Sequence, residues 1–229
     1  MITSGKTTTL AHCDDDDIFD IVHELEKSFG LSFARDAFRD VKTFGDLCTV
    51  FEQHLTAEHR DDCTSQQAFY RVRSAIVTTL PVDQNQVTPD SSLRTLFSKP
   101  GRRKRIHAFE TCLGVKVSLL VYPNWLVPVS CFLFACSFIA LLFSGKIAIA
   151  GFILLFVVNR LEKYYDSQFA MTTVRQLAEQ LTIEHYTAAR RFNHTVNRTE
   201  IRYIITQAFC KRFDMDKASL IPEATFGWA

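Results

Sequence analysis

The sequence predicts an all-α protein whose middle forms a helical hairpin inserted in a membrane. Apolar residues recur at the spacing of one helix face in several segments on both sides of that middle. No segment shows the alternation of apolar and polar residues that is typical of a strand. Residues 117 to 145 contain no charged residue, and a second apolar run follows Lys146. Because a helix needs about 20 apolar residues to cross a bilayer, the first run indicates membrane insertion.

The overall composition argues against several classes of protein. The chain has 229 residues, with 26 lysines and arginines against 25 aspartates and glutamates. This balance gives no reason to expect a nucleic-acid partner. The seven cysteines are odd in number and form no Cys-x-x-Cys pair, which argues against a zinc site and against a disulfide framework. Residues 1 to 13 lack the apolar core of a cleaved export signal.

The first helix is predicted to begin at a run of four aspartates, Asp14 to Asp17. Aspartate favours the first turn of a helix, where it meets free N–H groups and the positive end of the helix dipole. A metal site is the weaker alternative, because consecutive residues on a helix point in different directions. The positions at helical spacing are Ile18, Ile21, Val22, Leu25 and Phe29. Gly30 is placed to end this helix.

Further helices are predicted on both sides of the apolar middle. One runs from about Thr43, a plausible N-cap, to Leu55, and another is capped near Thr64 or Ser65 and ends near Leu80. An irregular polar loop with two prolines follows, and then a basic helix leads into the apolar region. Beyond the apolar region, residues 172–186 and 197–213 are also helical by period.

The apolar middle is predicted to form a membrane hairpin of two helices, at about 124–143 and 146–160. The basic cluster at 101–105 precedes it, and Arg160 and Lys163 follow it, so positive-inside logic places both ends of the chain in the cytoplasm. The expected location is a bacterial inner membrane, with the lipid bilayer as a partner. A buried hairpin in a soluble protein is the alternative. The basic cluster and the sequence Ala-Arg-Arg at 189–191 either set the topology or bind anionic lipid head groups.

The N-terminal helices carry a resemblance to a known family. Residues 25–30, Leu-Glu-Lys-Ser-Phe-Gly, and residues 42–47, Lys-Thr-Phe-Gly-Asp-Leu, match the second half of an acyl carrier protein in residue types and spacing. Residues 17–55 therefore resemble that family without its first helix. Residues 197–226 look like the missing first helix and its loop. The beginning and the end of the chain together would then make one circularly permuted carrier-like bundle.

The middle of the chain resembles the same family a second time. Residues 66–97 look like a first helix and loop, residues 105–119 like a second helix, and residues 169–181 like a last helix. The hairpin would be inserted between the second and last helices, which loops tolerate when the two ends lie close together. The predicted segments are 14–60 and 197–229 for one bundle, 64–116 and 161–190 for the other, and 117–160 for the hairpin.

The resemblance implies a serine that carries 4′-phosphopantetheine at the start of the second helix. Counting back from Phe29 by the family's spacing lands on Asp15, which has no hydroxyl. In the second bundle the same count lands on Lys99, and the neighbouring Ser98 is a remote alternative that lacks the flanking residues of the family motif. We therefore expect no prosthetic group, no metal and no catalytic residue.

These observations predict a membrane-anchored, non-enzymatic interaction or scaffolding protein, linked to fatty-acid or lipid enzymes. By analogy with carrier proteins, its docking face for a protein partner would be acidic and would comprise Asp14, Asp15, Asp16, Asp17, Asp20 and Glu24. A homo-oligomer is possible. Two alternatives remain: a functional acyl carrier that uses an unrecognised serine, and a small lipid-modifying membrane enzyme that uses the His-x4-Asp pair His12 and Asp17.

Overall fold

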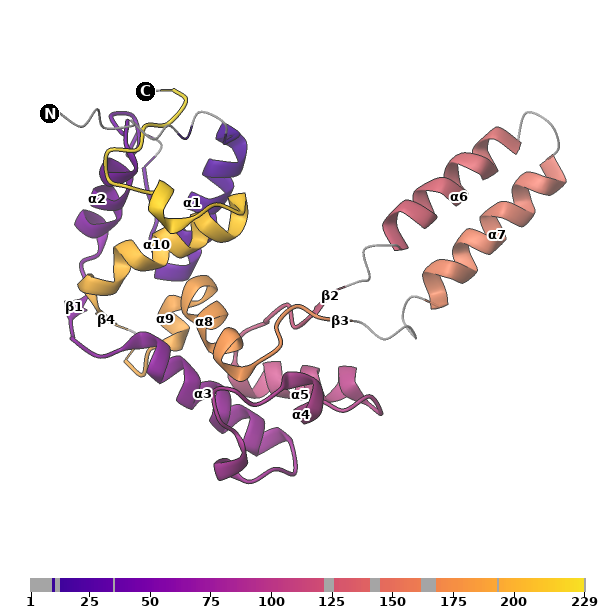
Figure 1. The fold of residues 1–229 in the computed structure, drawn as a ribbon, viewed down its shortest axis with the longest axis horizontal. Helices are drawn as coiled ribbons and strands as arrows, with labels where there is room; N and C mark the ends of the chain where they lie inside the picture. Colours follow the sequence, from indigo (N-terminus) through magenta and orange to yellow (C-terminus); the bar gives the residue numbers. More distant parts are fainter. Residues whose placement is uncertain are drawn as a thin grey trace, which may run out of the picture.

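A computed structural model describes residues 10, 13–34, 36–121, 126–140, 145–161, 168–192 and 194–228. These residues are mostly helical, so the prediction of an all-α protein is confirmed (Figure 1). The helices are α1 Asp15–Phe29, α2 Phe44–His54, α3 Thr64–Thr79, α4 Leu93–Leu96, α5 Arg102–Leu113, α6 Leu126–Ala140, α7 Gly145–Leu161, α8 Val174–Glu184, α9 Tyr186–Ala189 and α10 Arg198–Phe213. The strands have two residues each: β1 Glu58–His59, β2 Leu120–Val121, β3 Gln168–Phe169 and β4 Thr195–Val196.

The predicted helix ends hold for α1 and α2. Asp14 is the N-cap of α1 and accepts a hydrogen bond from the Asp16 N–H at 3.0 Å. Gly30 ends α1 with a left-handed φ of 66°, a conformation that glycine adopts without steric cost. Thr43 caps α2 in a capping box with Asp46. The N–H groups of Thr43 and Lys42 donate to the Asp46 carboxylate and hold its pKa below the usual value.

Both ends of the chain contribute to one hydrophobic core, here called the terminal core. It is formed by α1, α2, α10 and the segment that follows α10. The Leu10 N–H donates to the Thr225 carbonyl at 2.7 Å, which ties the first described residue to the C-terminal segment. Among its fully buried side chains are Ile21, Leu25, Phe44, Phe51, Ile205 and Phe209. The terminal segments therefore pair within one chain.

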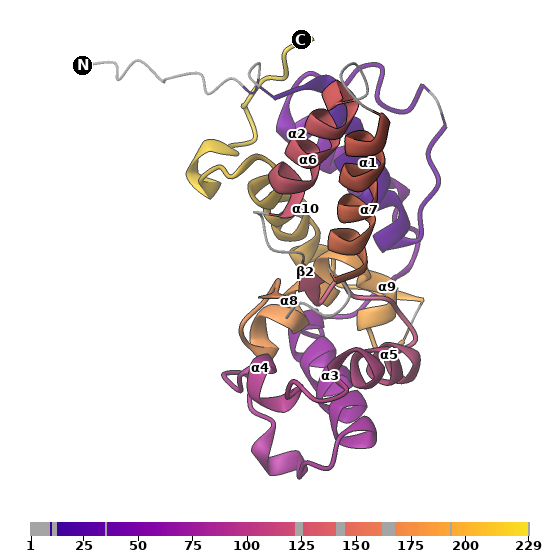
Figure 2. The same cartoon turned by 90° about the vertical axis from the view of Figure 1, so that its right-hand side faces the viewer.

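The remaining globular part forms a second core, here called the central core. It is formed mainly by α3, α5 and α8, with α4 and the polar loop between α3 and α4 closing one side. Its fully buried side chains include Val72, Ile76, Leu93, Phe97, Phe109, Val174 and Leu177. In Figure 2 the terminal core lies above, the central core below, and α8 and α9 between them.

The two cores share one pattern of backbone contacts: the segment that follows one helix, α10 or α3, is hydrogen-bonded to the start of another, α2 or α8. In the terminal core the bonds are Phe226 N–H to Lys42 O (3.1 Å), Phe44 N–H to Ala224 O (2.8 Å) and Gly45 N–H to Pro222 O (2.8 Å). In the central core they are Leu93 N–H to Thr172 O (3.0 Å), Val174 N–H to Ser91 O (3.1 Å) and Arg175 N–H to Pro89 O (2.7 Å). The single β-bridges Thr43–Thr225 and Ser92–Thr173 lie within these straps. We call this shared arrangement the strap.

The end of α1 in the terminal core is also matched by the end of α5 in the central core. In the terminal core, Glu26 accepts a hydrogen bond from the Phe33 N–H at 2.6 Å. In the central core, Glu110 accepts one from the Val117 N–H at 3.0 Å. Like Gly30, Gly114 ends its helix in the left-handed region, with a φ of 82°. Residues far apart in sequence thus perform the same structural roles in both cores.

The apolar middle forms two helices that lie side by side, α6 and α7 (Figures 1 and 2). The Phe134 ring meets the Phe152 ring edge to face at 6.2 Å between centroids. A side chain added at Gly151 would collide with Ser137, so the two helices approach closely there. Most large apolar side chains of this hairpin point outward, among them Phe132, Phe138, Ile149, Ile153 and Phe156.

The prediction that this hairpin spans a membrane is wrong for the part of the chain that the structure describes. There, no helix combines the length and apolar character that a crossing requires. Helix α6 has 15 residues and α7 has 17. At 1.5 Å per residue these helices are about 23 and 26 Å long, whereas the hydrocarbon core of a bilayer is about 30 Å thick.

The physical reason lies in how the charge-free run is divided. Its first part is extended rather than helical, because Leu120 and Val121 pair with β3 in antiparallel register. Lys146 stands in the first turn of α7, and Asn159 and Arg160 stand in its last turn, which shortens the apolar stretch. The predicted inner-membrane location and bilayer partner depended on these spans and are corrected with them.

Candidate functional site

The acidic residues predicted as a docking face lie around the first turn of α1 and, for Asp17, Asp20 and Glu24, along the side that faces Arg212 of α10. Asp14, Asp15 and Asp16 are exposed at the first turn. Arg212 reaches across from α10 and pairs with three further carboxylates: Asp17 at 2.8 Å, Asp20 at 3.1 Å and Glu24 at 4.0 Å. The hydrogen bond to Asp17 raises the pKa of the Arg212 guanidinium. Arg212 therefore leaves the negative charge of Asp14, Asp15 and Asp16 at the first turn of α1 without an ion pair from α10.

An exposed aromatic group lies beside these carboxylates. The Phe19 side chain on α1 is 55% exposed, and its ring stacks on Trp228 with centroids 6.0 Å apart. Trp228 also stacks on Phe226, at 4.6 Å, and its indole N–H donates to the Val41 carbonyl at 2.9 Å. The surface around α1 thus combines negative charge with a fixed apolar contact area.

The structure places the other predicted site residues apart from one another. Asp15 is the first residue of α1, and Ser98 lies between α4 and α5 with its side chain exposed. The Ser98 hydroxyl accepts a hydrogen bond from Arg105 at 3.0 Å. His12 lies outside the described residues, so its pairing with Asp17 has no geometry to discuss. Within the described ranges, no three His, Cys, Asp or Glu side chains lie close enough together to hold a metal ion.

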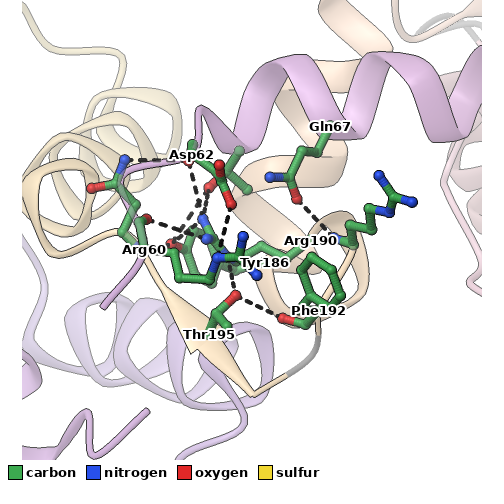
Figure 3. Close-up of polar contacts among 10 residues, drawn as sticks. Arg60, Asp62, Gln67, Tyr186, Arg190, Phe192 and Thr195 are labelled. Carbon is green, nitrogen blue, oxygen red and sulfur yellow. Dashed lines mark hydrogen bonds and ion pairs between the residues drawn. The ribbon is translucent and has the colours of Figure 1, made fainter. Parts of the chain in front are cut away.

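A buried arginine, which sequence reasoning did not find, joins the two cores. Arg190 directly follows α9 and is 0% exposed (Figure 3). Its Nε donates to the Thr195 hydroxyl at 3.1 Å, and its Nη1 donates to the Thr64 hydroxyl at 2.7 Å. Longer contacts reach the carbonyl groups of Asp62 and Arg60, at 3.3 and 3.4 Å. The guanidinium therefore binds the two segments that connect the cores.

The surroundings of Arg190 explain why these connections cross at one point. Strand β1 pairs in parallel with β4. Strand β1 precedes α3, where the chain enters the central core, and β4 precedes α10, where it returns to the terminal core. Tyr186, one turn before Arg190, accepts a hydrogen bond from the Asn197 N–H at 2.8 Å. Ser28 at the end of α1 donates to the Ile183 carbonyl at 2.6 Å. The junction between the cores is thus held by polar bonds as well as apolar packing.

A cleft of about 800 Å³ opens beside this junction. We call it the arginine cleft, and its walls include Arg60, Asp62, Tyr70, Arg71, Arg191 and Phe192. One wall is the outer face of α3 and the other is the segment after α9. Arg190 lies beneath it. The sequence signal for this site is the pair Arg190–Arg191. The prediction that this pair binds lipid head groups or sets a membrane topology is wrong for Arg190, because its side chain is buried.

Arginine side chains in the cleft are held in place by an aromatic ring and by backbone groups. The Arg60 guanidinium lies 4.5 Å from the centroid of the Phe192 ring, and the Arg191 guanidinium lies 5.7 Å from the same centroid. Such cation–π contacts orient the charge without neutralising it. Arg71 donates to the Leu113 carbonyl at 3.3 Å. Asp62 is the acidic side chain of the lining, and it pairs with Arg60 at 3.3 Å.

Comparison of the chain with models of protein families, with curated proteins and with solved structures finds no match.

Proposed function

We propose that the protein is a non-enzymatic interaction or scaffolding protein, built on two acyl-carrier-like bundles, that docks a partner through α1. The observation that carries this proposal is the strap, which recurs in both cores. With the terminal helices taken in the permuted order α10, α1, α2, the order of helices is also the same as α3, α5, α8 in the central core. The strap joins the two sequence segments that resemble the loop and the last helix of a carrier protein. The repeat supports the proposal because it makes the two cores alike in the segments for which the resemblance was noted.

The order of elements supports a permuted bundle in the terminal core. In this proposal, α10, its following loop, α1 and α2 correspond to the first helix, the long loop, the second helix and the last helix of the family. In the same proposal, the bond from Leu10 to Thr225 brings together the two segments that are continuous in an unpermuted chain. In the central core, α3, α5 and α8 follow the same order with the hairpin between α5 and α8.

The side chain at position 15 sets the chemistry of the proposal. A carrier protein needs a hydroxyl there to form the phosphodiester of phosphopantetheine, and Asp15 offers a carboxylate at the start of α1. A carboxylate at a helix start is stabilised by the helix dipole and adds to the negative potential of the surface. We infer a protein partner with a basic patch, which would approach the first turn of α1 and bury the exposed Phe19 ring.

The first experiment tests for a prosthetic group. The full chain is co-expressed with a phosphopantetheinyl transferase, and its intact mass is measured. We expect the mass of the unmodified chain, because Asp15 cannot accept the group. A gain of one phosphopantetheine would contradict the proposal, and its loss in Ser98→Ala would establish the alternative of a functional carrier, since Ser98 is exposed.

The second experiment tests the docking face. The immobilised chain captures partners from native extracts, and the same capture is repeated with the double variant Asp15→Lys, Asp16→Lys. The matched control is Asp36→Lys, Asp40→Lys, which changes the same charge at exposed positions elsewhere in the terminal core. We expect a partner, linked to fatty-acid or lipid enzymes, that binds less at higher salt and is lost with the first variant alone. Equal loss with both variants would show that α1 is not the docking face.

A further inference from the structure

The arginine cleft concentrates positive charge in a space of ligand size. Its volume of about 800 Å³ lies within the range of small-molecule sites, about 300 to 1,000 Å³. Arg60, Arg71 and Arg191 are exposed in its walls, whereas Asp62 is the acid that balances them. Like charges held close together repel one another, and a bound anion removes that cost. The cleft is therefore better matched to an anion than to a neutral or cationic ligand.

The geometry of the guanidinium groups narrows the class of anion. Arg60 and Arg191 both line the cleft and both lie near the Phe192 ring, at 4.5 and 5.7 Å from its centroid. Their orientation is fixed before any ligand binds, which lowers the entropy cost of binding. Arginine presents a planar set of N–H donors that matches the oxygens of a phosphate group, often with two parallel hydrogen bonds.

The floor of the cleft is rigid. Arg190 is fully buried and bonded to the Thr64 hydroxyl at 2.7 Å, and the Arg191 N–H donates to the Gln67 side chain at 2.7 Å. These bonds hold the wall after α9 against the wall of α3. A site whose walls are fixed by buried bonds is already formed, as small-molecule sites usually are.

We propose that the arginine cleft binds a small molecule that carries a phosphate or diphosphate group, with Arg60, Arg71 and Arg191 as its anion-binding residues. The proposal is independent of docking through α1, because the cleft is built from α3, the segment after α9 and the connection between the cores. Gln66 and Ser74 in the same lining offer neutral hydrogen-bond donors for the rest of the ligand. The negative charge of the phosphate is the feature that is recognised.

The test uses pyrophosphate as the probe and the full chain as the protein. Isothermal titration at low ionic strength should show saturable binding at one site, with inorganic phosphate weaker and malonate weaker still at matched ionic strength. The double variant Arg60→Gln, Arg191→Gln should weaken pyrophosphate binding at least about tenfold, because charge-assisted hydrogen bonds are lost. The control is Arg39→Gln, Arg94→Gln, which removes the same charge at exposed positions outside the cleft and should leave the affinity unchanged.

A second measurement needs no variant and so does not depend on variant folding. Cys63 is exposed and lines the cleft, whereas Cys112 is exposed on α5 outside it. Pyrophosphate should slow the alkylation of Cys63 and leave that of Cys112 unchanged. Absence of saturable binding at millimolar pyrophosphate, equal affinity in both double variants, or equal binding of malonate would overturn the proposal. So would tight binding of a single-stranded oligonucleotide that pyrophosphate does not displace.

Discussion

Replacing Arg190 tests whether the buried guanidinium holds the two cores together. In Arg190→Ala the hydroxyl groups of Thr64 and Thr195 and the carbonyl group of Arg60 lose the N–H donor that Arg190 supplies. The Asp62 carbonyl also loses that donor but keeps the one from the Asn197 side chain. The substitution also leaves a cavity at a site that is 0% exposed. Buried groups without hydrogen-bond partners and unfilled volume both lower the free energy of unfolding. We therefore expect Arg190→Ala to be strongly destabilising.

The size of the effect follows from the two short bonds. Hydrogen bonds to charged groups contribute about 1.5 to 3 kcal/mol each, and the bonds to Thr64 and Thr195 measure 2.7 and 3.1 Å. Their loss lowers the free energy of unfolding by about 3 to 6 kcal/mol, with the longer contacts adding less. Arg190→Met fills much of the same volume and removes a buried charge, so it should retain about 1 to 2 kcal/mol more than the alanine variant.

Urea denaturation followed by circular dichroism measures this effect. With a slope of about 2 to 3 kcal/mol per molar urea, the loss shifts the midpoint of Arg190→Ala by about 1 to 3 M. Arg39→Ala removes an exposed arginine and is the matched control, with an expected change below about 0.5 kcal/mol. Fluorescence of Trp228 in a Trp125→Phe background reports the terminal core separately. A midpoint for Arg190→Ala within about 0.3 M of the wild type would refute the role assigned to the network.

Two further predictions concern the terminal core. Burial raises the pKa of the Cys48 thiol to about 12 from its ordinary value of 9.0, so the unfolded chain releases this proton first. The contribution of Cys48 to the free energy of unfolding should therefore be full below pH 9 and should decrease as the pH rises above 9. A decrease that is just as large in Cys48→Ala would contradict this cause. Thr43→Ala removes the capping box of α2 and should lower the free energy of unfolding in urea by about 1 kcal/mol. Thr43→Ser keeps the hydroxyl and should lower it less. Equal losses in the two variants would show that the hydroxyl is not the stabilising group.

Local patterns in the sequence were sufficient for the helix ends and for most core positions. Asp14, Gly30 and Thr43 act through their own backbone and the nearest turn, so their roles depend on few distant residues. The spacing of Ile18, Ile21 and Leu25 identified the face that the structure buries. The start of α3 was predicted about one residue late, because Cys63 takes the N-cap position without a side-chain bond.

The arginine cleft could not be predicted from local patterns. Arg190 and Arg191 are neighbours of the same residue type, yet one is buried and the other is exposed. What separates them is the approach of Thr64 and Thr195, two residues from different parts of the chain. Arg60 reaches the cleft only because β1 pairs with β4. Long-range pairing of this kind leaves no periodic trace in one sequence.

In this chain the hydropathy of the hairpin and the fold of the two cores could not be inferred from each other. Strands β2 and β3 pair at its base, Leu120 with Phe169 and Val121 with Gln168, so the chain leaves and re-enters the central core at adjacent positions. Joining two ends that already lie together costs little conformational entropy, whatever the inserted segment contains. The charge-free run therefore gave no information about the cores, and the helical periods of the cores gave none about the hairpin. The strap of the central core, which includes the bond from Leu93 to Thr172, forms although the hairpin is inserted between α5 and α8. The strap of the terminal core forms without such an insertion. The helices of the central core, and not the hairpin, therefore determine how that core packs.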